Sequence, residues 1–178
     1  LTLQPSTLVS GQSRVTLIGG ARRAGTKDGA PSWSFEIEAK DGVLAAEDLG
    51  AGAVAVEKWA ASGLVVPRLG LMEIEAAVLR AGGAEVSLAG EVSAAGGQAG
   101  ARVEGRLSPM SVATLKAIWP KALAPPARKW VGAQVTRADI RGGSFRLASG
   151  PYLAGQPPPS PASPSRLTLT IETGEVSL

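Results

Sequence analysis

The chain of 178 residues contains no cysteine, no histidine and no asparagine. Without cysteine it has no thiolate nucleophile, no disulfide and no iron–sulfur ligand. Without histidine it has no Ser-His-Asp triad, no imidazole proton shuttle and no ordinary zinc site. The remaining reactive groups are carboxylates, lysine, arginine and tyrosine, and we predict neither a metal ion nor a cofactor.

Basic residues are neither in large excess nor clustered. The 18 lysines and arginines stand against 15 acidic residues, which gives a net charge of +3, and no three basic residues are consecutive. Aromatic residues make up 4% of the chain, whereas nucleic-acid-binding surfaces combine a basic patch with aromatic side chains. The sequence therefore predicts no nucleic-acid partner. The longest uncharged stretch, Leu147 to Ser165, is too rich in proline, glycine and serine to form a membrane-spanning helix.

Hydrophobic residues recur at every second position in segment after segment. In the segment 33–40, Phe35 and Ile37 fall on one side of an extended chain, and Glu36 and Glu38 fall on the other. Such alternation is typical of strands that bury one face. The same alternation occurs at 13–19, 72–78, 84–92 and 99–107.

Glycine-containing pairs separate these segments, at Asp41-Gly42, Gly82-Gly83 and Gly96-Gly97. Glycine accepts the positive φ of tight turns, and links this short produce antiparallel hairpins. We therefore predict a mainly β fold, a long antiparallel meander with one apolar face and one solvated face. The residues expected on the apolar face are Val15, Leu17, Phe35, Ile37, Ile74, Val78, Val86, Leu88, Val103 and Leu107.

Two short helices interrupt the alternation, at about 110–119 and 125–133. Val112, Leu115 and Ile118 share one helical face, Pro120 ends the first helix, and the prolines at 125 and 126 open the second. We expect a β-meander over 1–148 that contains a helical elbow at 109–134. A proline-rich loop or linker is expected at 149–165 and the start of further strands at 166–178, and the whole is interpreted as a piece of a longer chain.

Two sequence patterns have both a catalytic and a structural interpretation. Residues 50–55 match a relaxed G-x-G-x-x-A dinucleotide fingerprint, but acidic residues precede it where a buried parallel strand should be apolar. The residues of the pairs Glu36/Glu38 and Glu73/Glu75 lie two apart, so each pair shares one strand face, a spacing compatible with the two acids of a glycosidase. We favour a solvated outer face for these acids.

The helical elbow carries two tryptophans and a basic pair. Trp119 and Trp130 would suit the stacking of a sugar ring, but packing of the helices onto the sheet is the preferred interpretation. Arg128 and Lys129 are equally compatible with an anionic headgroup and with a solvated helix face.

The segment from Trp119 to Val131, WPKALAPPARKWV, is followed by the strand start ADIRGG at 138–143. It resembles the W-P-x-x-L-A-P-x-x-R-x-W-V signature of AsmA-like, YhdP-like envelope proteins of Gram-negative bacteria. The matching residues are Trp119, Pro120, Leu123, Pro125, Arg128 and Trp130. The segments 57–63 and 81–92 are similar to the β-repeats of this family.

The resemblance implies a non-enzymatic periplasmic protein, whose parent chain is anchored in the inner membrane by an N-terminal helix outside this segment. It implies a long curved sheet with an apolar groove that carries phospholipid acyl chains toward the outer membrane. The expected partners are phospholipid, the remaining segments of the parent chain and the inner membrane. The alternative is an envelope scaffold or adhesion-type β-module whose apolar face is an ordinary closed core.

Overall fold

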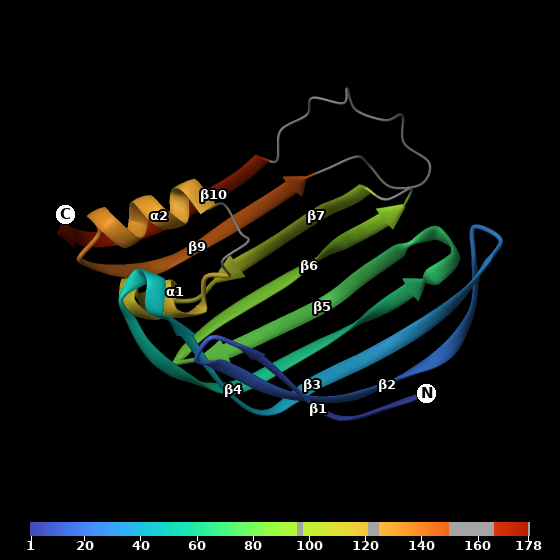
Figure 1. The fold of residues 1–178 in the computed structure, drawn as a ribbon. Helices are drawn as coiled ribbons and strands as arrows, with labels where there is room; N and C mark the ends of the chain where they lie inside the picture. The colour runs from blue at the N-terminus through green and yellow to red at the C-terminus, as the bar shows by residue number, and fades with distance from the viewer. Residues whose placement is uncertain (96–97, 121–124, 150–165, 178) are drawn as a thin grey trace.

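The computed structural model describes residues 1–95, 98–120, 125–149 and 166–177. The fold is mainly β, as predicted, and its strands form one antiparallel sheet in the order β1-β2-β3-β4-β5-β6-β7-β9-β10, with the short β8 paired to β9 (Figure 1). The strands are β1 (Thr2–Ser10), β2 (Ser13–Lys27), β3 (Ala30–Ala46), β4 (Ala51–Val66), β5 (Leu71–Ala81), β6 (Ala84–Ala95), β7 (Gln98–Leu107), β8 (Met110–Ser111), β9 (Arg137–Ser149) and β10 (Arg166–Ser177).

The helical elbow is inserted between β7 and β9, which pair directly with each other. It consists of α1 (Val112–Ile118) and α2 (Pro125–Gln134), close to the predicted ranges. The Ser111 hydroxyl caps α1 by accepting a hydrogen bond from the Thr114 backbone N–H at 3.1 Å. Trp119, the residue before Pro120, is extended and ends the helix.

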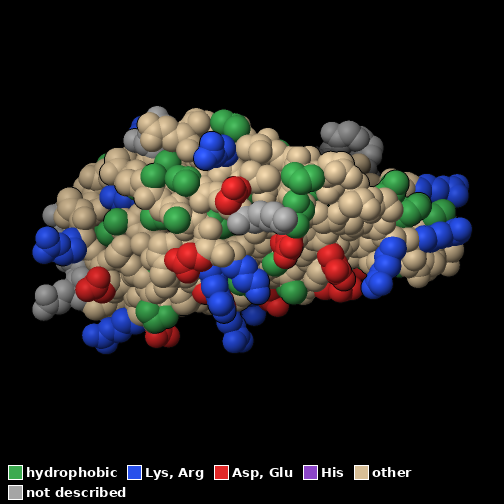
Figure 2. All heavy atoms as spheres, turned by 90° about the horizontal axis from the view of Figure 1, so that it is seen from below, with side chains coloured by type: hydrophobic (Ala, Val, Ile, Leu, Met, Phe, Trp, Pro, Cys, Tyr) green, Lys and Arg blue, Asp and Glu red, His purple; other side chains and the backbone are tan. Residues whose placement is uncertain are grey.

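The sheet bends into a trough. In Figure 1 the strands descend from β10 at the top to β1–β4 at the bottom, and both helices lie at one end of the trough. Helix α1 contacts β3 and β4 on one side and β9 on the other, so it spans the concave side of the sheet. The view from below, in Figure 2, shows acidic and basic side chains spread over the outer surface with only scattered hydrophobic ones. The polar face is therefore the convex one.

Cross-strand register places the hydrophobic residues on the concave face. Phe35 pairs with Gly63, Leu88 with Gly105, and Val103 with Leu147, and these pairs continue across neighbouring strands without changing face. Nine of the ten residues predicted for the apolar face fall on it: Val15, Leu17, Phe35, Ile37, Ile74, Val86, Leu88, Val103 and Leu107.

The prediction for Val78 is wrong, because its side chain lies on the outer face of the sheet. The register of β5 shifts by one residue between Ile74 and Ala77, so Val78 pairs with Ser87 on the outer face and Leu79 takes its expected place inside. A single extra residue reverses every side chain beyond it, because the side-chain period of a strand is two.

The turn predicted at Asp41-Gly42 was also wrong, since both residues lie within the 17-residue strand β3. The register with β2 shifts here, and a Cβ on Gly42 would lie 3.0 Å from the Arg14 carbonyl oxygen and 3.1 Å from the Val15 side chain. Gly42 thus lies beside a β-bulge and, because it has no side chain, allows β2 to approach β3 closely. The turn at Gly82-Gly83 is confirmed, with φ of 58° and 74°. Residues 96 and 97 lie outside the described ranges.

Separate hydrophobic clusters stabilise the two ends of the trough. At the helical end Leu115 and Trp119 pack with Leu107, Met110 and Ile140. At the opposite end the fully buried Val66 packs with Ala30 and Leu71 beside η2 (Pro67–Leu69). The predicted linker at 149–165 lies outside the described ranges apart from Ser149, and β10 joins the same sheet by pairing with β9.

Candidate functional site

The concave face is apolar yet only partly buried. Beneath the helices Leu107 and Ile140 are buried, and Phe35 is buried further along, but most of the larger hydrophobic side chains on this face away from the helices remain half-buried, among them Leu17, Ile37, Ile74, Leu88, Val103 and Leu147. Within the described ranges all strands belong to one sheet, so no second sheet covers this face. An ordinary β-sandwich would cover such a face and bury its side chains completely. We call this concave face of β2–β10 the groove.

The groove is hollowed beside α1. A cavity of about 370 Å³ is lined by Leu17, Trp59 and Leu79 from the strands and by Ile118 and Pro120 from the helical elbow. Residues from both β1 and β5 line it, which shows how far the sheet curls around this end. Trp59 and Leu79 pair directly across β4 and β5. Sequence alternation did not single out either residue, because the register changes twice in this region.

Arg128 fastens the helical elbow to the rim of the trough. It is 6% exposed, its Nη2 donates to Asp48 Oδ1 at 2.9 Å and its Nη1 to Asp48 Oδ2, while its Nε donates to the Trp119 carbonyl at 3.2 Å. Asp48 belongs to η1 (Glu47–Leu49), the turn between β3 and β4. The bond to the carboxylate raises the pKa of Arg128 above its ordinary value. The Arg128 side chain is thus buried in a structural ion pair with Asp48, which does not favour the headgroup interpretation of this residue.

Lys116 joins the two helices from inside. Its ammonium is buried and donates to the carbonyls of Val135 at 2.7 Å and Gly132 at 3.3 Å. These carbonyls belong to the C-terminal end of α2, where a cation offsets the partial negative charge of the helix dipole. Gly132 also lies against Leu49, since a Cβ there would be 2.6 Å from the Leu49 Cδ2. Both cations therefore hold the elbow in a fixed position over the end of the groove.

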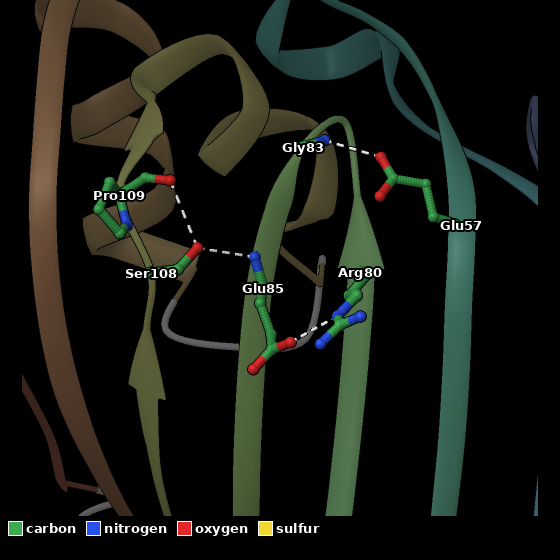
Figure 3. Close-up of polar contacts among 6 residues, drawn as sticks. All are labelled: Glu57, Arg80, Gly83, Glu85, Ser108 and Pro109. Atoms are coloured by element: carbon green, nitrogen blue, oxygen red, sulfur yellow. Dashed lines mark hydrogen bonds and ion pairs between the residues drawn. The ribbon is translucent and has the colours of Figure 1, made fainter.

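The strand turns below the elbow are tied together by polar contacts. Figure 3 shows the Gly83 N–H donating to Glu57 at 2.8 Å and Arg80 Nε donating to Glu85 at 2.5 Å. It also shows the Ser108 hydroxyl accepting from the Glu85 N–H at 2.7 Å. These bonds link β4, β5, β6 and the start of the elbow, so this end of the trough is held as a unit.

The two tryptophans of the elbow have different environments. Trp119 is buried in the cluster with Leu107 and Ile140, as expected for a packing residue. Trp130 is 56% exposed on α2, so its predicted packing onto the sheet was wrong. Lys129 is exposed beside it. Of the other motif residues, Pro120 and Pro125 are exposed, and Leu123 lies outside the described ranges.

The two catalytic patterns of the sequence do not form sites. Gly50, with φ of 63°, leads from η1 directly into strand β4, so the glycine pattern does not open a helix as a dinucleotide site requires. Glu36 and Glu38 are exposed on the outer face, and Glu73 forms an ion pair with Lys27. No group of three or more acidic side chains that could hold a metal ion occurs among the described residues.

The outer face is hollowed as well, and its hollows are larger than the one beside α1. One of about 680 Å³ runs over β5–β10 past Ser87, Glu104 and Arg106, and another of about 630 Å³ lies over β1–β5. Ionised side chains such as the Glu104–Arg146 pair line the first one, and they are well solvated. The charged lining distinguishes the first hollow from the apolar groove, so size alone does not select the site.

Comparison with known proteins gives no relative: no protein-family model, no curated protein and no solved structure matches the chain. Among the described helices, none is long and apolar enough to cross a membrane.

Proposed function

We propose that this chain is a segment of a bridge-like lipid-transfer protein that holds phospholipid acyl chains in its groove. The observation that carries the proposal is the continuous concave apolar face, half-buried and uncovered by any other described element away from the helices. Exposed apolar surface of this extent marks a partner or a lipid. The concave shape and the small residues within it favour slender acyl chains.

The mechanism needs no bond making or breaking. Each CH₂ group that leaves water for an apolar surface contributes about 0.8 kcal/mol, so long chains bind strongly without specific contacts. Since the groove offers hydrophobic residues along every strand from β2 to β10, a lipid moving along it exchanges one apolar contact for another. The headgroup stays in contact with water at the rim of the groove.

The cellular setting of the proposal rests on the resemblance at 119–145. The segment would belong to a non-enzymatic periplasmic protein, anchored in the inner membrane, that carries phospholipid between the inner and outer membranes. In this setting the elbow caps the groove at one end, where Leu115 and Trp119 fill the trough.

A pair of adjacent residues on β6 tests the proposal. Leu88 lies in the groove opposite Ala77 and Gly105, whereas Ser87 lies on the outer face opposite Val78 and Arg106. Leu88→Glu places a charge in the groove, and Ser87→Glu places the same charge next to an arginine outside. The protein and both variants are purified from bacterial cells, and bound phospholipid is measured by native mass spectrometry.

The expected result is that the unchanged protein and Ser87→Glu carry phospholipid and that Leu88→Glu carries at least five times less. Circular dichroism and thermal melting establish that both variants are folded. Equal lipid content in the two variants, or none in the unchanged protein offered phosphatidylglycerol vesicles, would overturn the proposal.

The rival is a scaffold module whose apolar face is closed by another protein segment. The observation in its favour is that β1 and β10 form the edges of the described sheet. In that case a partner segment would protect Leu88 and Trp59 from solvent, and no lipid would copurify.

A further inference from the structure

The end of the groove opposite the helices carries an arginine beside a tryptophan. Arg23 on β2 pairs with Trp33 on β3, shortly before the β2–β3 hairpin that rises at the end of the trough away from α1 and α2 (Figure 1). Register places both on the concave face, in line with Leu17 and Ile37. Trp33 is half-buried and Arg23 is exposed.

Arg23 differs from the other charged side chains of the sheet. Among the described residues that the register places in the groove beyond the helices, it is the one that bears a charge. Its side chain makes no hydrogen bond or ion pair with any residue of the described ranges. The acids on the adjoining strand, Glu36 and Glu38, pair with Gly20 and Ile18 and face outward. Lys27, four residues further on, is paired with Glu73 on the outer face.

We infer that Arg23 binds the phosphate of a phospholipid headgroup at this mouth of the groove, with the acyl chains directed toward α1. The inference rests on the proposed function and adds an orientation and a preference for anionic lipid. The guanidinium group is suited to a phosphate because its planar N–H groups bind two oxygens at once. The neighbouring Trp33 is of the kind that lies at headgroup level in membranes, with an apolar ring and one polar N–H.

The dimensions of the groove agree with this placement. Arg23 lies six residue steps from Leu17 along β2, a distance of about 20 Å at the rise of a strand. One acyl chain in a bilayer occupies half of the hydrocarbon core, or about 15 Å. A lipid held at Arg23 would therefore extend along Ile37 and end close to the hollow at Trp59, before α1 closes the trough.

The test compares two lipids with the same acyl chains. Dioleoyl-phosphatidylglycerol carries a phosphate, and dioleoylglycerol does not. Each is offered to the unchanged protein in vesicles of digalactosyldiacylglycerol, which carries no phosphate, and the bound amounts are quantified by mass spectrometry after the vesicles are removed. We expect the unchanged protein to prefer phosphatidylglycerol by about tenfold, as a charge-assisted bidentate contact allows.

Arg22 provides the matched control. It adjoins Arg23 in the chain but faces outward, where its Nε lies 3.3 Å from the Ser34 hydroxyl. Arg23→Gln is expected to lose the preference for phosphatidylglycerol while still binding dioleoylglycerol, and Arg22→Gln is expected to keep the preference. Both variants remove one exposed positive charge, so a general effect of net charge would change them equally.

The outcomes separate the inference from the proposed function. If Arg23→Gln keeps the preference, or both variants lose it equally, the headgroup site is wrong although the groove still binds lipid. If inorganic phosphate at millimolar concentration displaces phosphatidylglycerol, Arg23 holds a free anion and the inference is overturned. If the unchanged protein takes up neither lipid, the proposed function itself fails.

Discussion

The guanidinium group of Arg128 and the carboxylate of Asp48 join a helix and a strand turn that lie 80 positions apart in the chain. The arginine is buried, whereas the Asp48 side chain is 43% exposed. The pair orients α2 against η1, and the Nε of the same arginine donates a hydrogen bond to the Trp119 carbonyl. It connects the elbow to the sheet, and through the elbow it positions the wall that closes the groove.

Arg128→Ala should therefore destabilise the fold. It removes the bidentate contact with Asp48 and the hydrogen bond from the arginine Nε to the Trp119 carbonyl, a loss of about 2 kcal/mol. Lys129→Ala, the neighbouring exposed cation, should change the free energy of unfolding by less than about 0.5 kcal/mol. Urea denaturation measures both. An equal effect of the two substitutions would contradict the role assigned to Arg128.

The ion pair between Lys27 and Glu73 should stabilise the fold at neutral pH and lose this contribution at alkaline pH. The hydrogen bond to the Glu73 carboxylate raises the pKa of Lys27 above 10.5, its ordinary value. The ion pair stabilises the folded protein fully at pH values below the pKa that Lys27 has in the unfolded chain. This contribution is lost as the pH rises through the higher pKa that Lys27 has in the folded protein. Thermal melting between pH 8 and pH 12 should show that the advantage over Lys27→Gln disappears toward the alkaline end. Lys129→Gln, on exposed α2, should show no such convergence.

Tryptophan fluorescence should report occupation of the groove. Trp59 lines the hollow beside α1, whereas Trp130 is exposed on the outside of α2. Acyl chains would replace water around Trp59 and shift its emission to shorter wavelength. Trp33 and Trp119 are present in both variants, so phosphatidylglycerol should shift the emission of Trp130→Phe more than that of Trp59→Phe, and the difference reports Trp59. Equal shifts in the two variants would mean that lipid does not reach the hollow.

Two glycines should differ sharply in their tolerance of a methyl group. Gly90 has φ of 152°, and a Cβ there would lie 2.2 Å from the Arg102 carbonyl oxygen of the neighbouring strand. Gly90→Ala should cost about 1–3 kcal/mol because both the backbone and the neighbouring strand would have to shift. Nothing lies within 4 Å of a Cβ on Gly52, so Gly52→Ala should be nearly neutral. Calorimetry of the two variants distinguishes these outcomes.

Much of the fold could be predicted from local pattern. Alternation of Phe35 and Ile37 with Glu36 and Glu38 determines which side chains share a face, because a strand turns each successive residue to the opposite side. The prolines at 120 and 125 determine where the first helix ends and the second begins, because the missing proline N–H acts over a few residues.

Other features were decided by tertiary structure. The face of Val78 depends on one extra residue in β5 relative to its partner strands, which only the pairing of three strands reveals. The contact of Arg128 with Asp48 and the exposure of Trp130 depend on where the elbow meets the β3–β4 turn. The sequence by itself determined that one face of a sheet is apolar, since that is a property of each strand alone. Only the tertiary structure decided that this face is concave, closed by helices at one end and marked by Arg23 at the other, because curvature and register arise from all the strands together.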